Sequence, residues 1–558
     1  MQATPTSVIQ YFNGEKQNLI PLFQRPYTWT QANWQTLWDD LMVQYDSDDE
    51  NPHFMGAIVS LPANSVPVGV SKFLIIDGQQ RLATISVLLC ALRDRLDARS
   101  ALRIQEVYLT NPHRDADDKL KFVPTQKDRD AYKSVVLDRG IPPIDCPTGN
   151  LLTGAYNFFL KQLDEKDSNE DAVIPAKVLT TLEHCLQVVM INLGDNDDPY
   201  LIFESLNFKG ELLTQADLVR NYVLMRFRHS ITAGGEQEYI YTHYWRPLEE
   251  LLKDNLTEYL RHYTMKDGED IKRGGIYAAI KKKIPQTAEP ETIKKEIKQM
   301  YRFGKFYAKF LSPSAEADPS IRCRIEHIRD LKVTTAYPLL LRFFDAHDTH
   351  TLSTIELERC LSLIESFVVR RSVCGVPTNA LNKLFVQWAK NFPLTDHAKW
   401  LHTAMISGRA SRQFPKDDEF AKAFISSPQY GRGTTRFILC RLEQSFGHKE
   451  PVDLASLTIE HLLPQDLTDE WRDMLGPDAE KTHDILCHTF GNLTLTGYNS
   501  ELGNLPFDEK KKKLAPTHVE LSQWVLAQSK WTEHEMRERA NYLFNRANAL
   551  WPGPEIPL

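Results

Sequence analysis

The residues with the clearest chemical potential lie in the last quarter of the chain. A TIEHLLPQ segment at 458–465 is followed by FGNLTL at 490–495, and then by Asn499. If the first segment is a strand, adjacent Glu460 and His461 project to opposite sides of it, so that the carboxylate can hold a cation while the imidazole faces water. Carboxylate and amide oxygens suit Mg²⁺ or Mn²⁺, and a neutral imidazole can take a proton from water. These groups fit metal-assisted hydrolysis of a phosphodiester.

The same residues resemble the signature of the HNH, or ββα-metal, nucleases, in which an acidic-His pair precedes two apolar residues and Pro, and an Asn follows in a second strand. The resemblance implies that His461 is the general base and Glu460 the first metal ligand. It implies that Asn492 braces the loop that orients the histidine and that Asn499 is the last metal ligand, with Asn504 as a rival. This family more often has Asp at the first ligand and His at the last, so the identity of the divalent metal stays open.

The chain contains its own comparison for this motif. A second pair, Glu326-His327, lacks the Pro, the Gly-Asn-Leu strand and the later Asn. We expect it to lie on a helix surface.

A run of four lysines follows the nuclease-like segment. Cationic side chains there could contact the phosphates of DNA, but such a run is equally typical of a solvated helix face. The possible DNA contacts are Lys510, Lys511, Lys512 and Lys513.

Two N-terminal segments also stand out, IPLFQRPYTW at 20–29 and IIDGQQR at 75–81. The pattern predicts a strand ending at Asp77, a turn at Gly78 and a helix beyond it. That turn would offer backbone N–H groups and a positive helix end to an anion, with Arg81 as a further donor. Alternatively, Asp77 and Gln80 form a capping box that needs no ligand.

Together with residues 202–221, these segments resemble the ParB/sulfiredoxin-like N-terminal domain of GmrSD-type, or type IV, modification-dependent restriction enzymes, in a single-chain form. The resemblance implies nucleotide binding and hydrolysis by the motif, with Mg²⁺ on its aspartate; ATP and GTP both stay open, and the chain has no Walker A loop. The nucleotide-binding residues it implies are Arg25, Asp77, Gly78, Gln79, Gln80 and Arg81. It also implies DNA as substrate and a homodimer.

The pattern of helices and strands that must position these motifs predicts a multidomain, mainly α protein with α/β parts. We expect a ParB/sulfiredoxin-like α+β domain with a helical extension at 1–230, a helical relay domain at 231–425 and a ββα-metal module at 426–558. Arg370 and Arg371, in the middle, either contact the DNA backbone or brace a contact between domains, and bracing is favoured.

Composition limits the partners. The 66 Lys+Arg and 74 Asp+Glu of the 558 residues give a net charge of −8, which excludes binding of nucleic acid by bulk charge. No signal peptide or membrane span is readable, and the eight scattered cysteines predict reduced thiols in the cytoplasm.

Two hypotheses follow. The favoured one is an antiphage endonuclease that uses NTP and a divalent metal to cleave modified DNA, with hydroxymethylated or glucosylated cytosine as the favoured modification and phosphorothioate also open. The alternative is a nucleotide-gated DNA-binding or regulatory protein whose HNH module does not cut.

Overall fold

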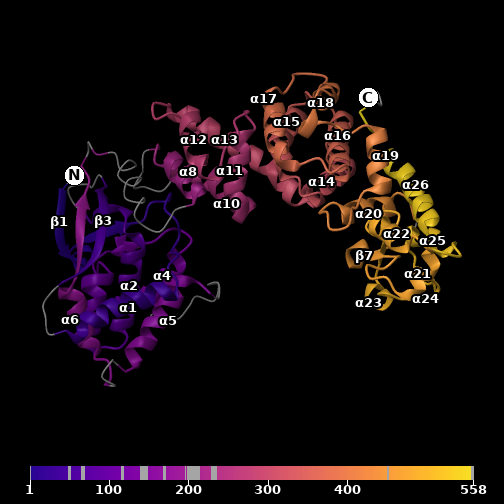
Figure 1. Cartoon of the computed structure of the whole chain (residues 1–558). Helices are drawn as coiled ribbons and strands as arrows, with labels where there is room; N and C mark the ends of the chain where they lie inside the picture. The colour runs from indigo at the N-terminus through magenta and orange to yellow at the C-terminus, as the bar shows by residue number, and fades with distance from the viewer. Residues whose placement is uncertain are drawn as a thin grey trace. The chain divides into compact units, whose positions relative to one another are not determined.

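The structure is a computed structural model that describes residues 2–47, 52–63, 69–114, 118–138, 149–166, 171–194, 197, 214–227, 235–448 and 452–554. It divides into two compact units (Figure 1). Unit 1 contains Met1–Pro247 and Ile284–Ile297, and unit 2 contains Leu248–Lys283 and Lys298–Leu558. The expected boundaries at 230 and 425 stay predictions.

Unit 1 is built on a mixed six-stranded sheet of order β1-β6-β3-β4-β2-β5. The β1/β6 and β3/β4 pairs are antiparallel, and the β3/β6, β2/β4 and β2/β5 pairs are parallel. Its strands are β1 (Gln2–Ser7), β2 (Lys16–Leu19), β3 (His53–Pro62), β4 (Ser71–Asp77), β5 (Phe122–Val123) and β6 (Leu186–Asn192).

Helix α2 (Gln79–Arg93) is the core of this unit. The predicted strand, turn and helix around residue 78 are confirmed, because β4 ends at Asp77 and α2 follows directly after Gly78. The apolar residues that predicted the helix, among them Leu82, Ile85 and Leu88, are fully buried. The other α-helices in the described part of unit 1 are α1 (Gln31–Asp46), α3 (Ala98–Ile104), α4 (Arg129–Leu137), α5 (Leu151–Asp164), α6 (Pro175–His184), α8 (Gln215–Leu224) and α9 (Glu236–Ile240).

Unit 2 is mainly helical. Helices α10 (Arg246–Leu252) and α13 (Pro290–Leu311) cross the division between the units. The first part of unit 2 then contains α11 (Leu256–Met265), α12 (Ile276–Lys283), α14 (Pro319–Asp330), α15 (Tyr337–Asp348), α16 (Thr354–Val373), α17 (Leu381–Lys390), α18 (His397–Ile406), α19 (Asp417–Ser426) and α20 (Thr435–Gln444).

A two-stranded antiparallel sheet follows, formed by β7 (Thr458–His461) and β8 (Leu493–Thr496). Short helices lie between and after the strands, and the long α26 closes the unit (Figure 1). They are α21 (Asp469–Leu475), α22 (Ala479–Leu486), α23 (Asn499–Leu502), α24 (Phe507–Leu514), α25 (Glu520–Leu526) and α26 (Glu533–Leu550). The protein is therefore mainly α with one mixed sheet, as expected.

Within the described ranges, no helix combines the length and the apolar character that crossing a membrane requires.

Arg370 and Arg371 brace unit 2 from the inside. Both side chains are buried, which rules out the DNA contact that the sequence left open. Arg370 Nε donates to the Trp551 carbonyl O over 2.7 Å, and its other nitrogens reach Asn548 and Asp417. The arginines therefore brace contacts inside unit 2, and bracing between domains stays a prediction.

Candidate active site in the β7–β8 module

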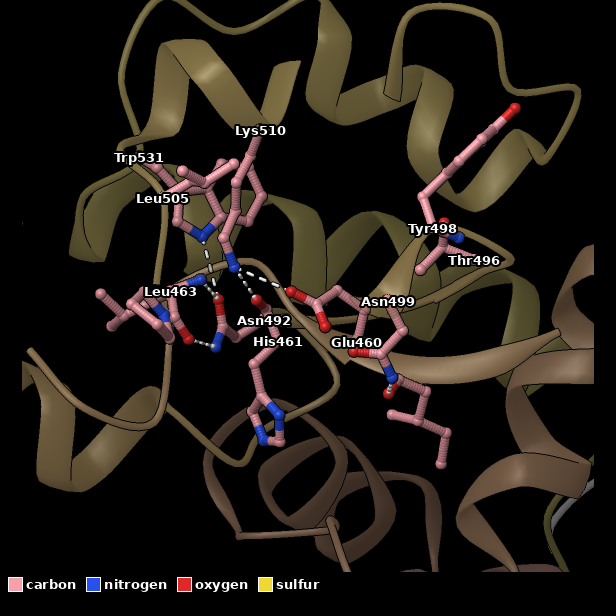
Figure 2. Close-up of polar contacts among 12 residues, drawn as sticks. Glu460, His461, Leu463, Asn492, Thr496, Tyr498, Asn499, Leu505, Lys510 and Trp531 are labelled. Carbon is pink, nitrogen blue, oxygen red and sulfur yellow. Dashed lines mark hydrogen bonds and ion pairs between the residues drawn. The ribbon is translucent and has the colours of Figure 1, made fainter. Parts of the chain in front are cut away.

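The β7–β8 pair sets the positions of the predicted nuclease residues. In the antiparallel register Glu460 lies opposite Thr494 and His461 opposite Leu493. Asn492 directly precedes β8, and Asn499 begins α23 just after it. Figure 2 shows the imidazole of His461 directed away from the Glu460 carboxylate, as alternation along a strand requires.

Asn492 is fully buried and holds the loop that leaves β7. Its Oδ1 accepts from Leu463 N over 2.6 Å, and its Nδ2 donates to the Leu463 carbonyl O (Figure 2). Nδ2 also donates to the Cys487 carbonyl O. Trp531 Nε1 donates to the same Oδ1 over 3.0 Å. An amide is the one side-chain group that can both accept and donate in this way, so these contacts explain an Asn at this position.

Gly491 lets α26 pack against this segment. A Cβ at position 491 would lie 2.2 Å from the Met536 carbonyl O. The guanidinium of Arg539, also on α26, is buried and donates to the carbonyl oxygens of Phe490, Gly491 and Leu493. The Gly-Asn-Leu segment is thus fixed by the last helix of the chain.

His461 is 5% exposed and shares a 3.1 Å hydrogen bond between its Nε2 and His488 Nδ1. Burial, together with the nearby cationic or imidazole groups of His488 and Lys510, lowers the pKa of His461 to about 4. The ring is therefore neutral at neutral pH, as a general base must be. When the shared proton lies on His461 Nε2, the lone pair of His461 Nδ1 is left for a water molecule.

His488 is a residue of the candidate site that the sequence analysis did not select. Its ring stacks with Tyr430, and Tyr430 also contacts the His461 ring edge-on at 4.4 Å between centroids. In the sequence, His488 lies four residues before Asn492 in the same segment. Nothing in that spacing, however, shows that the chain folds this ring back onto β7.

Glu460 forms a buried ion pair with Lys510. Lys510 Nζ lies 2.8 Å from Glu460 Oε1 and also donates to the His461 carbonyl O over 2.7 Å (Figure 2). Burial raises the pKa of Glu460 and lowers that of Lys510, and the ion pair opposes both shifts. The suggested DNA contact at Lys510 is therefore wrong, because its side chain is 1% exposed and faces inward.

The other three lysines of the run are also paired. Lys511 Nζ donates to the Gln528 carbonyl O. Lys512 and Lys513 are exposed and form ion pairs with Glu509 and Glu501. A DNA phosphate would have to displace these carboxylates, and DNA contact at the three positions stays a prediction.

The oxygen donors needed for a divalent cation are present around β7. Asn499 Nδ2 donates to Ile459 O over 3.0 Å and to Thr458 Oγ1 over 3.1 Å, which leaves its Oδ1 as the atom that can face a cation. Because Ile459 directly precedes Glu460 in β7, the Asn499 amide is anchored to the residue next to Glu460. The donor chemistry fits Mg²⁺ or Mn²⁺, although the cation would share Glu460 with the Lys510 ammonium.

A second set of possible ligands lies on the His461 side of β7. Among the described residues, the ligand atoms of His461, Cys487 and His488 lie within 4.8 Å of one another. Nitrogen and sulfur donors of this kind suit softer ions such as Zn²⁺ rather than Mg²⁺. An ion bound there would coordinate His461, and this imidazole could then not act as the general base.

The N-terminal motifs are brought together in unit 1. Gln80 Oε1 accepts from Thr28 N, and Gln80 Nε2 donates to the Pro26 carbonyl O, so residues 75–81 contact residues 20–29. The predicted capping box between Asp77 and Gln80 is wrong, because the helix is capped by Gly78 and the Gln80 side chain is used elsewhere. Tyr27 of the first segment is a core residue whose hydroxyl accepts a hydrogen bond from Trp34 Nε1.

Gly78 is required by the backbone. Its φ of 91° is left-handed, and a Cβ would lie 2.8 Å from Ile58 Cγ1. This turn places Asp77 beside the guanidinium groups of Arg81 and Arg25. Burial raises the pKa of Asp77, and the two arginines and the Gly78 backbone amide oppose that shift.

A cavity of about 10 Å³ lies in the same region, lined in part by Arg25, Gln79 and Gln80. It has room for a single water molecule, so a nucleotide would have to bind on the open side of the motif. Of the segment 202–221, residues 202–213 lie outside the described residues, and beyond them Thr214 and Asp217 form a capping box at the start of α8.

Two comparisons place the chain among known proteins. Residues 8–224 match the N-terminal domain of GmrSD restriction endonucleases, and residues 414–546 match their C-terminal domain. Together the two matches cover more than half of the chain, including both sets of residues described above. No curated protein matches the sequence.

Proposed function

Because the chain belongs to the GmrSD family of restriction endonucleases, we propose that it cleaves modified phage DNA with a metal-dependent centre at β7–β8. The observation that carries this proposal is the His461 ring. It is neutral, hydrogen-bonded to His488 Nδ1 and mounted on a strand whose exit loop Asn492 fixes. This arrangement presents one basic nitrogen in a fixed direction.

In the proposed reaction His461 Nδ1 takes a proton from the attacking water. When the proton shared with His488 lies on His461 Nε2, Nδ1 is free, and Asn492 fixes the loop that follows the histidine. Glu460 and Asn499 would hold a divalent cation, which supplies positive charge to the phosphate when it is bound.

The N-terminal unit supplies the control of cutting in this proposal. Asp77 and its neighbours bind and hydrolyse a nucleoside triphosphate, ATP or GTP, and Asp77 holds its Mg²⁺. Hydroxymethylated or glucosylated cytosine is the favoured modification. The protein acts in the cytoplasm as a homodimer, which would let two centres address both strands.

One observation favours a second function. The Lys510 ammonium already occupies one oxygen of Glu460, as a substitute cation would. A module that never exchanges Lys510 for a metal would not cut. The chain would then be a nucleotide-gated DNA-binding protein.

Digestion of plain, hydroxymethylated, glucosylated and phosphorothioated DNA, with and without NTP and Mg²⁺, tests the proposal. We expect cleavage of at least one modified DNA, and a loss of roughly 10²–10⁴-fold in His461→Ala, the usual cost of a missing general base. His534→Ala, at an exposed histidine of α26, should cut like the wild type. Equal cleavage by wild type and His461→Ala would disprove the site, and no cleavage of any DNA would favour the second function.

The nucleotide site is tested separately. We expect Asp77→Ala to abolish hydrolysis of ATP and GTP while the circular dichroism spectrum is unchanged. Asp39→Ala, at an exposed aspartate of α1, is the matched control. Unchanged turnover in a folded Asp77→Ala protein would contradict the role of this carboxylate.

A further inference from the structure

A Cys–His–Glu relay lies in the helical part of unit 2, outside the candidate active site. Cys323 Sγ is 3.4 Å from His327 Nε2, and His327 Nδ1 is 2.9 Å from Glu365 Oε2. We propose that Cys323 is a nucleophilic thiolate and a site of covalent modification by low-molecular-weight disulfides. The proposal does not depend on the nuclease function.

Helix geometry creates the first contact of this relay. Cys323 and His327 are four residues apart on α14, which places them one above the other on the same face. The thiol is exposed to solvent, whereas His327 is 7% and Glu365 2% exposed. His327 was expected on a helix surface; this is wrong, because the ring turns inward to the buried carboxylate on α16.

Glu365 is fixed independently of the thiol. Trp551 Nε1 donates to its Oε1 over 2.9 Å, and Arg324 NH1 lies 3.2 Å from its Oε2. Arg441 Nε on α20 is 3.8 Å from Oε1. The acceptor that orients His327 therefore keeps its place whether or not Cys323 reacts.

The charges around the sulfur favour the thiolate. The hydrogen bond with His327, together with the positive fields of His327, Arg441 and Arg324, lowers the pKa of Cys323. Burial acts to lower the pKa of His327, but its hydrogen bonds to Cys323 and Glu365 outweigh burial and raise it. Glu358 on α16 pairs with Arg324.

The other described cysteines supply the comparison. Burial raises the pKa of Cys374 to about 11 and that of Cys487 to about 12, and it also raises the pKa of Cys90, Cys360 and Cys440. Thiols whose pKa is raised in this way are mostly protonated and react slowly, whereas an exposed thiolate next to a cation reacts.

The reaction is a thiol–disulfide exchange. The Cys323 thiolate attacks one sulfur of a small disulfide, a new S–S bond forms at Cys323, and the old S–S bond breaks. The departing thiolate carries the electron pair and can take the proton that His327 held. When the pKa of a thiol falls by one unit towards ambient pH, the fraction present as thiolate rises about tenfold, while the nucleophilicity of that thiolate falls roughly threefold. The observed rate of exchange therefore rises roughly threefold per pKa unit.

The test measures the rate at each cysteine of the full-length protein, with 5,5′-dithiobis(2-nitrobenzoic acid) as the disulfide probe. Reaction is stopped at intervals, and free thiols are labelled with isotope-coded iodoacetamide and mapped by mass spectrometry. We expect Cys323 to react at least about tenfold faster than Cys374 and Cys440 at pH 7.

His327→Gln separates activation from simple exposure. We expect the Cys323 rate to fall about tenfold in this variant and its pH profile to move to higher pH, while the Cys185 rate is unchanged. A second variant, His327→Asn, keeps the proposal testable if the first does not fold. A Cys323 rate that is no faster than that of Cys374, or that is the same with and without His327 in a folded variant, would overturn the proposal.

Discussion

At the scale of single residues, the β7–β8 module is organised around one hydrogen bond. His461 Nε2 and His488 Nδ1 lie 3.1 Å apart, and one proton serves both atoms. Because the shared proton determines which nitrogen of His461 is free, His488 controls the direction of the basic lone pair without touching the substrate. It is a positioning residue in the proposed reaction.

We expect His488→Ala to lower kcat for DNA cleavage by about 10- to 100-fold, the usual cost of losing a group that orients a functional histidine, with little change in KM. His488→Asn should recover part of the loss, because its side chain can again accept from His461 Nε2. Single-turnover kinetics on a modified duplex measure both. An equal loss in the two variants, or a change in KM alone, would show that the ring has a different role.

The sequence was most informative at this scale. Glu460, His461, Asn492 and Asn499 could be selected because the chemistry and the resemblance both require those residue types. The partners of these residues could not be selected in the same way. Lys510 is one of four adjacent lysines, and only the phase of α24 decides which of them turns inward to Glu460.

At the scale of elements, the small β7–β8 sheet depends on helices that follow it in the chain. Arg539 of α26 binds three carbonyl oxygens around β8, and Lys510 of α24 binds Glu460 in β7. Two strands alone are marginally stable in water, so these contacts and the cluster around Trp531 supply the stability of the module.

Replacing Lys510 should destabilise the protein strongly. Lys510→Met leaves the Glu460 carboxylate buried without its counter-charge, which costs about 3–5 kcal/mol when one partner of a buried pair is removed. Lys512→Met breaks an exposed pair and should cost less than about 1 kcal/mol. Urea unfolding followed by tryptophan fluorescence compares the two. Similar values for both variants would show that the Glu460–Lys510 pair contributes little.

Elements could be predicted from local pattern, but their pairing could not. The run at 72–77 and the helix after it were found from hydrophobic spacing alone. The sheet, however, pairs β1 with β6, in which Ser7 lies opposite Gln187, and the alternation of a strand contains no information on its neighbour.

At the scale of the whole molecule, the net charge of −8 belongs to a protein that combines two family domains in one chain. A net acidic surface weakens general attraction to DNA, and specific contacts must provide the rest. Its helical part also contains buried groups that respond to pH. His262 is 4% exposed, its Nδ1 lies 3.0 Å from Tyr307 Oη, and burial lowers its pKa to about 3.

This histidine should make stability fall in acid. The unfolded chain binds a proton at His262 below its ordinary pKa of 6.5, whereas the folded chain does so only near pH 3. The contribution of His262 to the free energy of unfolding is therefore complete above pH 6.5 and is lost as the pH falls below that value. Between pH 7 and pH 5 we expect a loss of about 2 kcal/mol from this group.

Urea unfolding at the two pH values measures this loss, and His262→Gln should reduce the pH difference by that amount. His534→Gln, at an exposed position, should leave it unchanged. An unaltered pH difference in His262→Gln would show that the acid sensitivity arises elsewhere.

The contacts that Trp531 and Arg539 make with the Asn492 segment also set an order of events during synthesis. A ribosome completes β7 and β8 well before it adds residues 531 and 539, which hold the loop after His461 and the start of β8. A nascent or prematurely terminated chain that stops before Trp531 therefore contains His461 but lacks the contacts that fix the loop after it. In the proposed function, only chains finished through α26 could damage DNA, which would protect the host genome from incomplete copies of its own defence.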